Sequence, residues 1–105
     1  MDADNFHYYL RNEYRGVRSL EPLGIKPAND AVSRCNRIEH VLGINLDQFL
    51  KGNDGNLNIL LEIITKNAAS FNIDGNIDKG IASIKNAAKR YHEYGVFSIK
   101  STSPH

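Results

Sequence analysis

The chain has 105 residues with 13 basic and 12 acidic side chains, so its formal net charge is only +1. A chain of this length makes a single domain, here residues 1–105, and buries about two thirds of its unfolded surface without disulfides or metals. One cysteine and four scattered histidines exclude an internal disulfide and a zinc pattern, and the small net charge gives no global reason to expect nucleic-acid binding.

The lone cysteine also favours a reducing compartment, and we expect a cytoplasmic protein. The opening residues, MDADNF, are acidic where a signal peptide is basic. No apolar run approaches the roughly 18 residues that a membrane span requires. We therefore expect no membrane partner and no metal or other cofactor.

The first predicted helix covers residues 4–15 and carries Phe6, Leu10 and Val17 on one stripe. The segment 17–29 follows, with two prolines and a glycine, and predicts a long connection.

Residues 29–50 then form an apolar helix and a short second turn. At 100° per residue, four apolar side chains of this helix fall within about 40° of one another and predict a buried stripe: Ala31, Cys35, Ile38 and Leu42.

Local signals predict the ends of these two helices. Asn29 and Asp30 are the expected N-cap of the first, and Gly43 is expected to end it in the left-handed conformation. Asn45 followed by Gln48 predicts a capping box at the start of the second.

After a predicted surface loop at 51–56, a further helix begins at Leu57. Five apolar residues share one face of it: Leu60, Leu61, Ile64, Ala68 and Phe71. Ile59 and Ile63 lie on the other side, so either the helix is enclosed by its neighbours or these two form an exposed patch for a partner protein. Helices that are apolar all round are usually buried, which favours the enclosed arrangement.

The last predicted helix follows the turn NIDGN, with Asp74 or Asn76 as its cap and Gly95 as its end. A polar tail follows from about residue 98. The inward stripe is regular over four turns and contains Ile77, Ile81, Ile84, Ala88 and Tyr91.

No catalytic or metal-binding pattern stands out. Cys35 and His40 are five residues apart, about 140° on a helix, so a buried structural thiol is a better interpretation than a nucleophile with its base. Residues 74, 76 and 78 have the spacing that starts a calcium loop, but lysines stand where the loop needs glycine and glutamate. We therefore expect no enzyme activity and no small-molecule substrate.

Basic charge gathers near the C-terminus, because residues 79–105 hold five basic and one acidic side chain whereas residues 41–78 hold two and five. Together with two arginines one turn apart on the central helix, it gives five candidate phosphate contacts: Arg34, Arg37, Lys85, Lys89 and Arg90. Solvated outward charges are the alternative.

Five tyrosines concentrate in the two terminal helices: Tyr8, Tyr9, Tyr14, Tyr91 and Tyr94. We expect several to pack where these helices meet, and the alternative is that exposed members stack on nucleic-acid bases.

Three pieces of the sequence resemble motifs of one known family. FHYYL at residues 6–10, AVSRCNRIEHVLGINLDQFL at 31–50 and IASIKNAAKRYHEYGVF at 81–97 are similar to its FxxYL, SxYxSxLxRxxxFL and ALrxYxxF patterns. The family is the helical, SAM-like core-binding domain at the N-terminus of phage integrases and other tyrosine recombinases. The matching pieces cover most of the chain.

This resemblance implies an all-α, SAM-like bundle of four to five helices that clamps double-stranded DNA through its backbone, with the five cations above as the contacts. The family's catalytic domain has no counterpart here, so Tyr91 and Tyr94 are not expected to be nucleophiles. The chain would then be a module of a larger integrase or restriction protein, or a free-standing protein with the same fold. The alternative function is a small protein-interaction module, such as a phage or mobile-element inhibitor of a host nucleoprotein, that uses Ile59 and Ile63 or the tyrosines.

Overall fold

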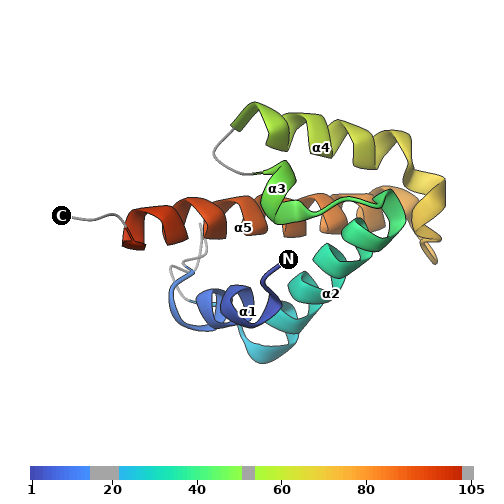
Figure 1. Ribbon diagram of the computed structural model, residues 1–105. Coiled ribbons are helices and arrows are strands. Elements are labelled where there is room, and N and C mark those ends of the chain that lie inside the picture. Colours follow the sequence, from blue (N-terminus) through green and yellow to red (C-terminus); the bar gives the residue numbers. More distant parts are fainter. Residues whose placement is uncertain (15–21, 51–53, 103–105) are drawn as a thin grey trace.

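The computed structural model describes residues 1–14, 22–50 and 54–102, with residue 54 and residues 98–102 described as backbone only. Over these residues the chain forms five α-helices and a short 3-10 helix, which confirms the all-α bundle (Figure 1). The elements are α1 (Ala3–Asn12), α2 (Ile25–Leu42), α3 (Leu46–Phe49), α4 (Asp54–Lys66), the 3-10 helix η1 (Ala68–Phe71) and α5 (Ile77–Thr102).

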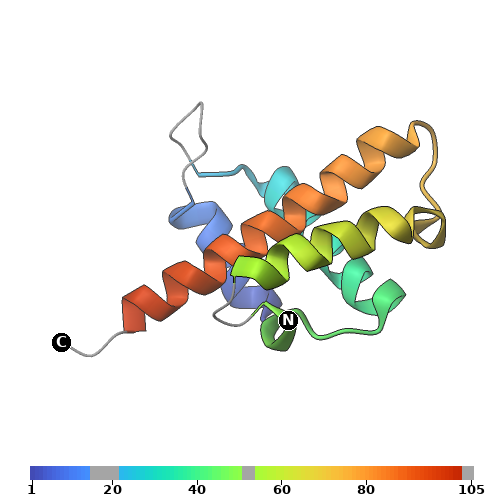
Figure 2. The same ribbon diagram turned by 90° about the horizontal axis from the view of Figure 1, so that it is seen from above.

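The long helix α5 is the centre of the arrangement. It runs through the middle of the molecule, with α4 antiparallel along one side and α1 and α2 on the other (Figures 1 and 2). The short helix α3 lies close to the N-terminus. Buried residues from all five helices and η1 form one hydrophobic cluster around α5.

Helix α1 confirms the first predicted helix, although it ends at Asn12 rather than at residue 15. Asp2 caps it by accepting a hydrogen bond from the Asn5 backbone N–H at 3.4 Å. Phe6 and Leu10 are fully buried, as the predicted stripe requires. Val17, the third member of that stripe, lies outside the described residues.

Helix α2 begins four residues before its predicted cap, so the prediction that Asn29 and Asp30 cap it is wrong. Gly24 is the N-cap, and Pro27 lies inside the first turn. A proline is tolerated there because the first backbone N–H groups of a helix have no partner within the helix. Three members of the predicted α2 stripe are fully buried, namely Ala31, Cys35 and Ile38, whereas Leu42 is partly buried.

The predicted end of α2 at Gly43 and the Asn45 cap of α3 are confirmed. Gly43 adopts the left-handed conformation, with φ 65°. Asn45 caps α3 by accepting from the Gln48 N–H at 3.2 Å. The Glu39 carboxylate accepts from the Leu46 N–H at 2.9 Å and from the Met1 amino group at 3.0 Å, so it ties α2 to α3 and to the N-terminal segment.

Helix α4 begins at Asp54, so residues 54–56 are helical where a loop was predicted. Leu60 and Ile64 are fully buried on its inner face. Ile59 is 49% exposed and Ile63 is half-buried, which contradicts the enclosed arrangement favoured from the sequence. Other helices cover only the inner side of α4, as its outer position in Figure 1 shows.

Helix α5 starts where the sequence indicates, because Asn76 accepts from the Lys79 N–H at 3.0 Å. Four residues of the predicted stripe are buried: Ile81, Ile84, Ala88 and Tyr91. Ile77 is 55% exposed, because it is the first residue of the helix and lies beyond the core. Gly95 does not end α5, which continues to Thr102, and Phe97 packs on Tyr9 with ring centroids 5.1 Å apart.

No helix within the described residues is both long and apolar enough to cross a membrane.

Candidate functional site

Cys35 is the single cysteine of the chain, and its surroundings make the thiol unreactive. Its side chain is fully buried, and Sγ lies 3.4 Å from the carbonyl oxygen of Ala87 on α5. Burial, and then the negative charge of Glu39, raise the pKa of the thiol to about 12. His40 is exposed on the surface of α2. The interpretation of Cys35 as a structural thiol is therefore confirmed.

Two of the five predicted phosphate contacts lie on α2. Arg34 is half-buried and Arg37 is exposed. Nη2 of Arg37 donates to the carbonyl oxygen of Asn72 at 3.2 Å, which holds the guanidinium against the segment after η1. Because a guanidinium has five N–H donors, this bond leaves Arg37 with donors for a further acceptor.

The other three lie on α5. At 100° per residue, Lys85, Lys89 and Arg90 span an arc of about 140° on the side away from the buried stripe. Lys89 is exposed, and Lys85 and Arg90 are half-buried at the edges of the arc. Glu93 lies in the same arc, between Lys89 and Arg90, and lowers its net positive charge.

The five cations therefore form two groups, one on α2 and one on α5. Among the described residues, none of them forms an ion pair with a carboxylate; the ion pairs there involve the N-terminal amino group, Lys26 and Lys66. Arg90 makes a different contact: its Cζ lies 5.6 Å from the ring centroid of Tyr14, within the range of a cation–π interaction.

The tyrosines pack where α1 meets α5, as expected. The rings of Tyr9 and Tyr94 are 5.5 Å apart, and those of Tyr9 and Tyr14 are 6.2 Å apart. Phe6 joins them at 4.9 Å from Tyr91, edge to face. Tyr8 is the exception, because its side chain is 62% exposed.

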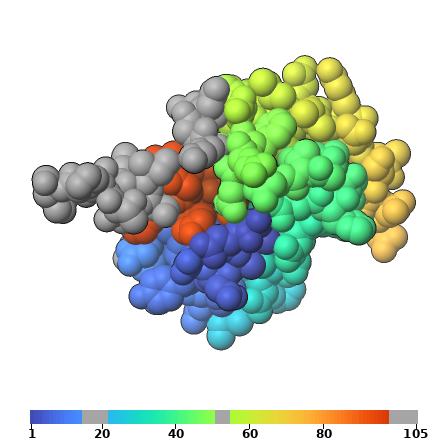
Figure 3. All heavy atoms as spheres, in the orientation of Figure 1, coloured from blue at the N-terminus to red at the C-terminus, as the bar shows by residue number. Residues whose placement is uncertain are grey.

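Tyr91 connects α5 to two other segments through its hydroxyl. It donates to Oδ1 of Asp47 in the first turn of α3 and accepts from the backbone N–H of Asp2 at 2.9 Å. Burial, and then the hydrogen bond to Asp47, raise the pKa of this phenol far above its usual range. The N-terminal segment, α3 and α5 meet on one face of the molecule (Figure 3).

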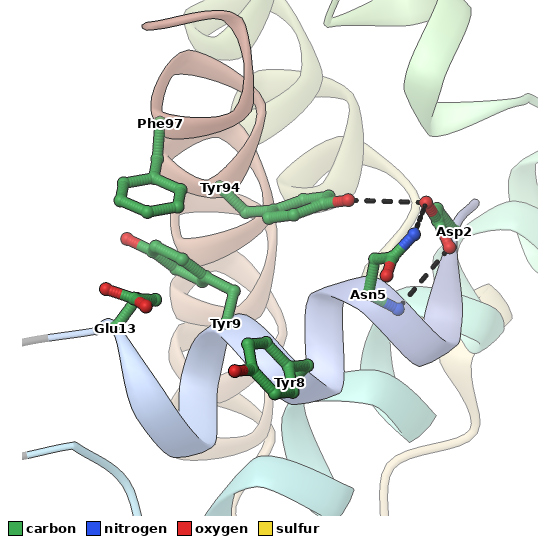
Figure 4. Close-up of a pocket in the computed structure, with 7 residues that line it drawn as sticks. All are labelled: Asp2, Asn5, Tyr8, Tyr9, Glu13, Tyr94 and Phe97. Atoms are coloured by element: carbon green, nitrogen blue, oxygen red, sulfur yellow. Dashed lines mark hydrogen bonds between the residues drawn. The ribbon is translucent and has the colours of Figure 1, made fainter. Parts of the chain in front are cut away.

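A cleft of about 270 Å³ lies between α1 and α5, beside this aromatic cluster (Figure 4). Seven residues line it: Asp2, Asn5, Tyr8, Tyr9, Glu13, Tyr94 and Phe97. The hydroxyl of Tyr94 donates to Asp2 at 3.3 Å at one end. Glu13 lies beside the hydroxyl end of Tyr9 at the other.

The cleft has a negative character. The side chain of Asn5 donates to Asp2 at 2.8 Å, and this bond lowers the pKa of the Asp2 carboxyl, which is therefore ionised at neutral pH. Burial, followed by the negative charges of Glu93 and Glu13, raises the pKa of Tyr9.

This cleft was not predicted from the sequence. Its residues come from the two ends of the chain, which no spacing rule connects. The sequence held one signal of an exposed aromatic side chain on α1. Tyr8 and Tyr9 are about 100° apart on a helix and cannot both point into the core.

Over the described ranges, no group of three His, Cys, Asp or Glu side chains could hold a metal ion. Comparison of the chain with protein-family models, with curated proteins and with solved structures found no match.

Proposed function

We propose that this chain is a non-catalytic helical module that binds double-stranded DNA through the phosphate backbone, as a SAM-like core-binding domain does. Five cations are the proposed contacts: Arg34, Arg37, Lys85, Lys89 and Arg90. The proposal places the protein in the cytoplasm, in keeping with its single reduced thiol.

The observation that carries the proposal is the arc of three cations on α5. Lys85, Lys89 and Arg90 lie on one outward arc of α5, where Lys89 is exposed and the other two are half-buried. Glu93 lies in the same arc, but none of the three cations forms an ion pair within the described residues. Lysine and arginine side chains in such an arrangement can each replace a counterion on a phosphate, which favours binding without reading the base sequence. The resemblance to the integrase domain supports the same role for Arg34 and Arg37.

Charge reversal on the two helices tests this function. We expect Lys89→Glu and Arg37→Glu each to weaken binding of a short labelled duplex about tenfold at low salt, because each replaces an attraction to phosphate by a repulsion. Fluorescence anisotropy measures the affinity. Lys66→Glu is the control, since Lys66 lies on α4 outside both groups, where it pairs with Glu62 at 3.9 Å. Equal affinities for all three variants and the parent chain would contradict the proposal.

Exposure of the outer face of α4 favours a second candidate, a protein-interaction module of the kind a phage or mobile element uses to inhibit a host nucleoprotein. Ile59 is 49% exposed, and Ile63 follows it one turn later on the same face. Sedimentation and pull-down with the parent chain and with Ile59→Ser test it. A parent chain that stays monomeric and captures no protein would count against this candidate.

A further inference from the structure

The cleft between α1 and α5 is built from groups that attract positive charge. Tyr8 and Tyr9 of α1 and Tyr94 and Phe97 of α5 surround it with aromatic rings (Figure 4). The π-face of such a ring carries partial negative charge and attracts a cation placed over it. The rings of Tyr9, Tyr94 and Phe97 are held in place by their mutual packing, at 5.5 and 5.1 Å from Tyr9.

Carboxylates stand at both ends of this aromatic lining. Asp2 is ionised at one end, where Asn5 and Tyr94 donate to it, and the exposed Glu13 stands at the other. An anion such as phosphate would be repelled by both carboxylates. A neutral apolar group would take water away from them without giving any charge in return. A cation is attracted both by the rings and by the two carboxylates.

The same aromatic cluster already holds one cation of the chain itself. The guanidinium of Arg90 lies over the ring of Tyr14, 5.6 Å from its centroid, and the ring of Tyr14 packs against Tyr9. Arg90 and Tyr14 do not line the cleft, so this contact leaves the cleft available for a second cation.

We propose that the cleft binds the ammonium group of a lysine side chain from a partner protein. A side chain suits it better than a small free cation, because the rim is exposed and apolar: Tyr8 is 62% exposed and Phe97 is 37% exposed. These rings would cover the methylene stem of the lysine while its ammonium group reaches the carboxylate of Glu13, and Asp2 at the other end adds a longer-range attraction. The inference goes beyond DNA binding and does not depend on it, since the cleft carries the opposite sign of charge.

The test compares two capped peptides that differ only in charge, Gly-Gly-Lys-Gly-Gly and the same peptide with norleucine in place of lysine. Both are titrated into the full chain, and NMR follows the amide and ring signals of Tyr8, Tyr9 and Glu13. We expect the lysine peptide to bind about tenfold more tightly than the norleucine peptide. Equal affinities, or no shift at the cleft with either peptide, would overturn the proposal.

Two variants place the binding at the cleft. We expect Tyr8→Ala and Glu13→Gln each to weaken binding of the lysine peptide about threefold. Both side chains are exposed, so both variants should fold as the parent does. The matched controls are Ile25→Ala and Glu62→Gln, which remove an exposed apolar group and an exposed carboxylate elsewhere and should change nothing.

Choline is the third probe, because it presents a cation without a peptide. If choline shifts the cleft signals and the lysine peptide does not, the site takes a small organic cation and the lysine assignment is wrong. If the lysine peptide binds more tightly than choline, the assignment to a protein side chain is supported. Duplex DNA binding is measured separately on Tyr8→Ala and should equal that of the parent, so the two proposals can fail independently.

Discussion

Cys35 lies at the contact between α2 and α5, where a small side chain lets the two helices approach. The buried thiol stays protonated in the folded protein well above neutral pH, because its pKa is about 12 against an ordinary value of 9.0. A group whose pKa is raised by folding contributes stability that is fully present below its unfolded pKa and is lost as the pH rises toward the folded pKa. For Cys35 the window of loss runs from about pH 9 to about pH 12.

This linkage gives a measurable pH dependence. Between pH 9 and pH 10 we expect Cys35 to reduce the free energy of unfolding by about 1 kcal/mol, and Cys35→Ala should remove that loss whatever its effect at pH 8. Urea unfolding of the parent chain and of Cys35→Ala at pH 8, 9 and 10 measures this loss of stability. The window stops at pH 10 because Tyr91, also a buried proton donor, begins to contribute above it. An equal decline in the free energy of unfolding of the two proteins would show that burial does not keep the Cys35 thiol protonated.

Among the helices, α5 shows how glycine acts differently at two positions of one element. A Cβ at Gly80 would overlap the side chain of Ile73, whereas a Cβ at Gly95 would meet no atom within 4 Å. Neither glycine has the left-handed backbone that would require it. The room available for a Cβ therefore decides how substitution of each glycine changes stability.

We expect Gly95→Ala to stabilise the protein by about 0.5–1 kcal/mol, because alanine loses less backbone entropy than glycine in a helix. Gly80→Ala gains the same helix propensity but forces Ile73 to move, and we expect a net destabilisation of about 1 kcal/mol. Urea unfolding at neutral pH compares the two variants with the parent chain. Stabilisation by both would mean that Ile73 yields freely and that the close approach at Gly80 is unimportant.

The helices also show what the sequence can and cannot predict. Gly43, Asn45 and Asn76 act on backbone groups within a few residues, so these helix ends were predicted from local chemistry. The start of α2 and the continuation of α5 past Gly95 were predicted wrongly, because buried Ala28 and the ring of Phe97 pack beyond the local signals for these helix ends. Phe97 against Tyr9, a contact between opposite ends of the chain, is one such interaction.

For the whole molecule, the net charge of +1 conceals two surfaces of opposite sign. The strip of Lys85, Lys89 and Arg90 on α5 is positive, whereas the cleft beside Tyr94 on the same helix is flanked by carboxylates. The sequence indicated the first surface, because its three cations lie within six residues. It did not indicate the second, because α1 and α5 come together only when the chain folds.

The most direct test of the central claim is the salt dependence of duplex binding. Each phosphate contact contributes about −0.9 to the slope of log affinity against log salt concentration, so five contacts predict a slope of about −4.5 and the three on α5 alone about −2.7. Anisotropy titrations between about 50 and 200 mM salt give this slope, and Lys89→Gln should reduce its magnitude by about 0.9. A slope near zero, or no duplex binding at the lowest salt, would contradict a backbone-binding role for this chain.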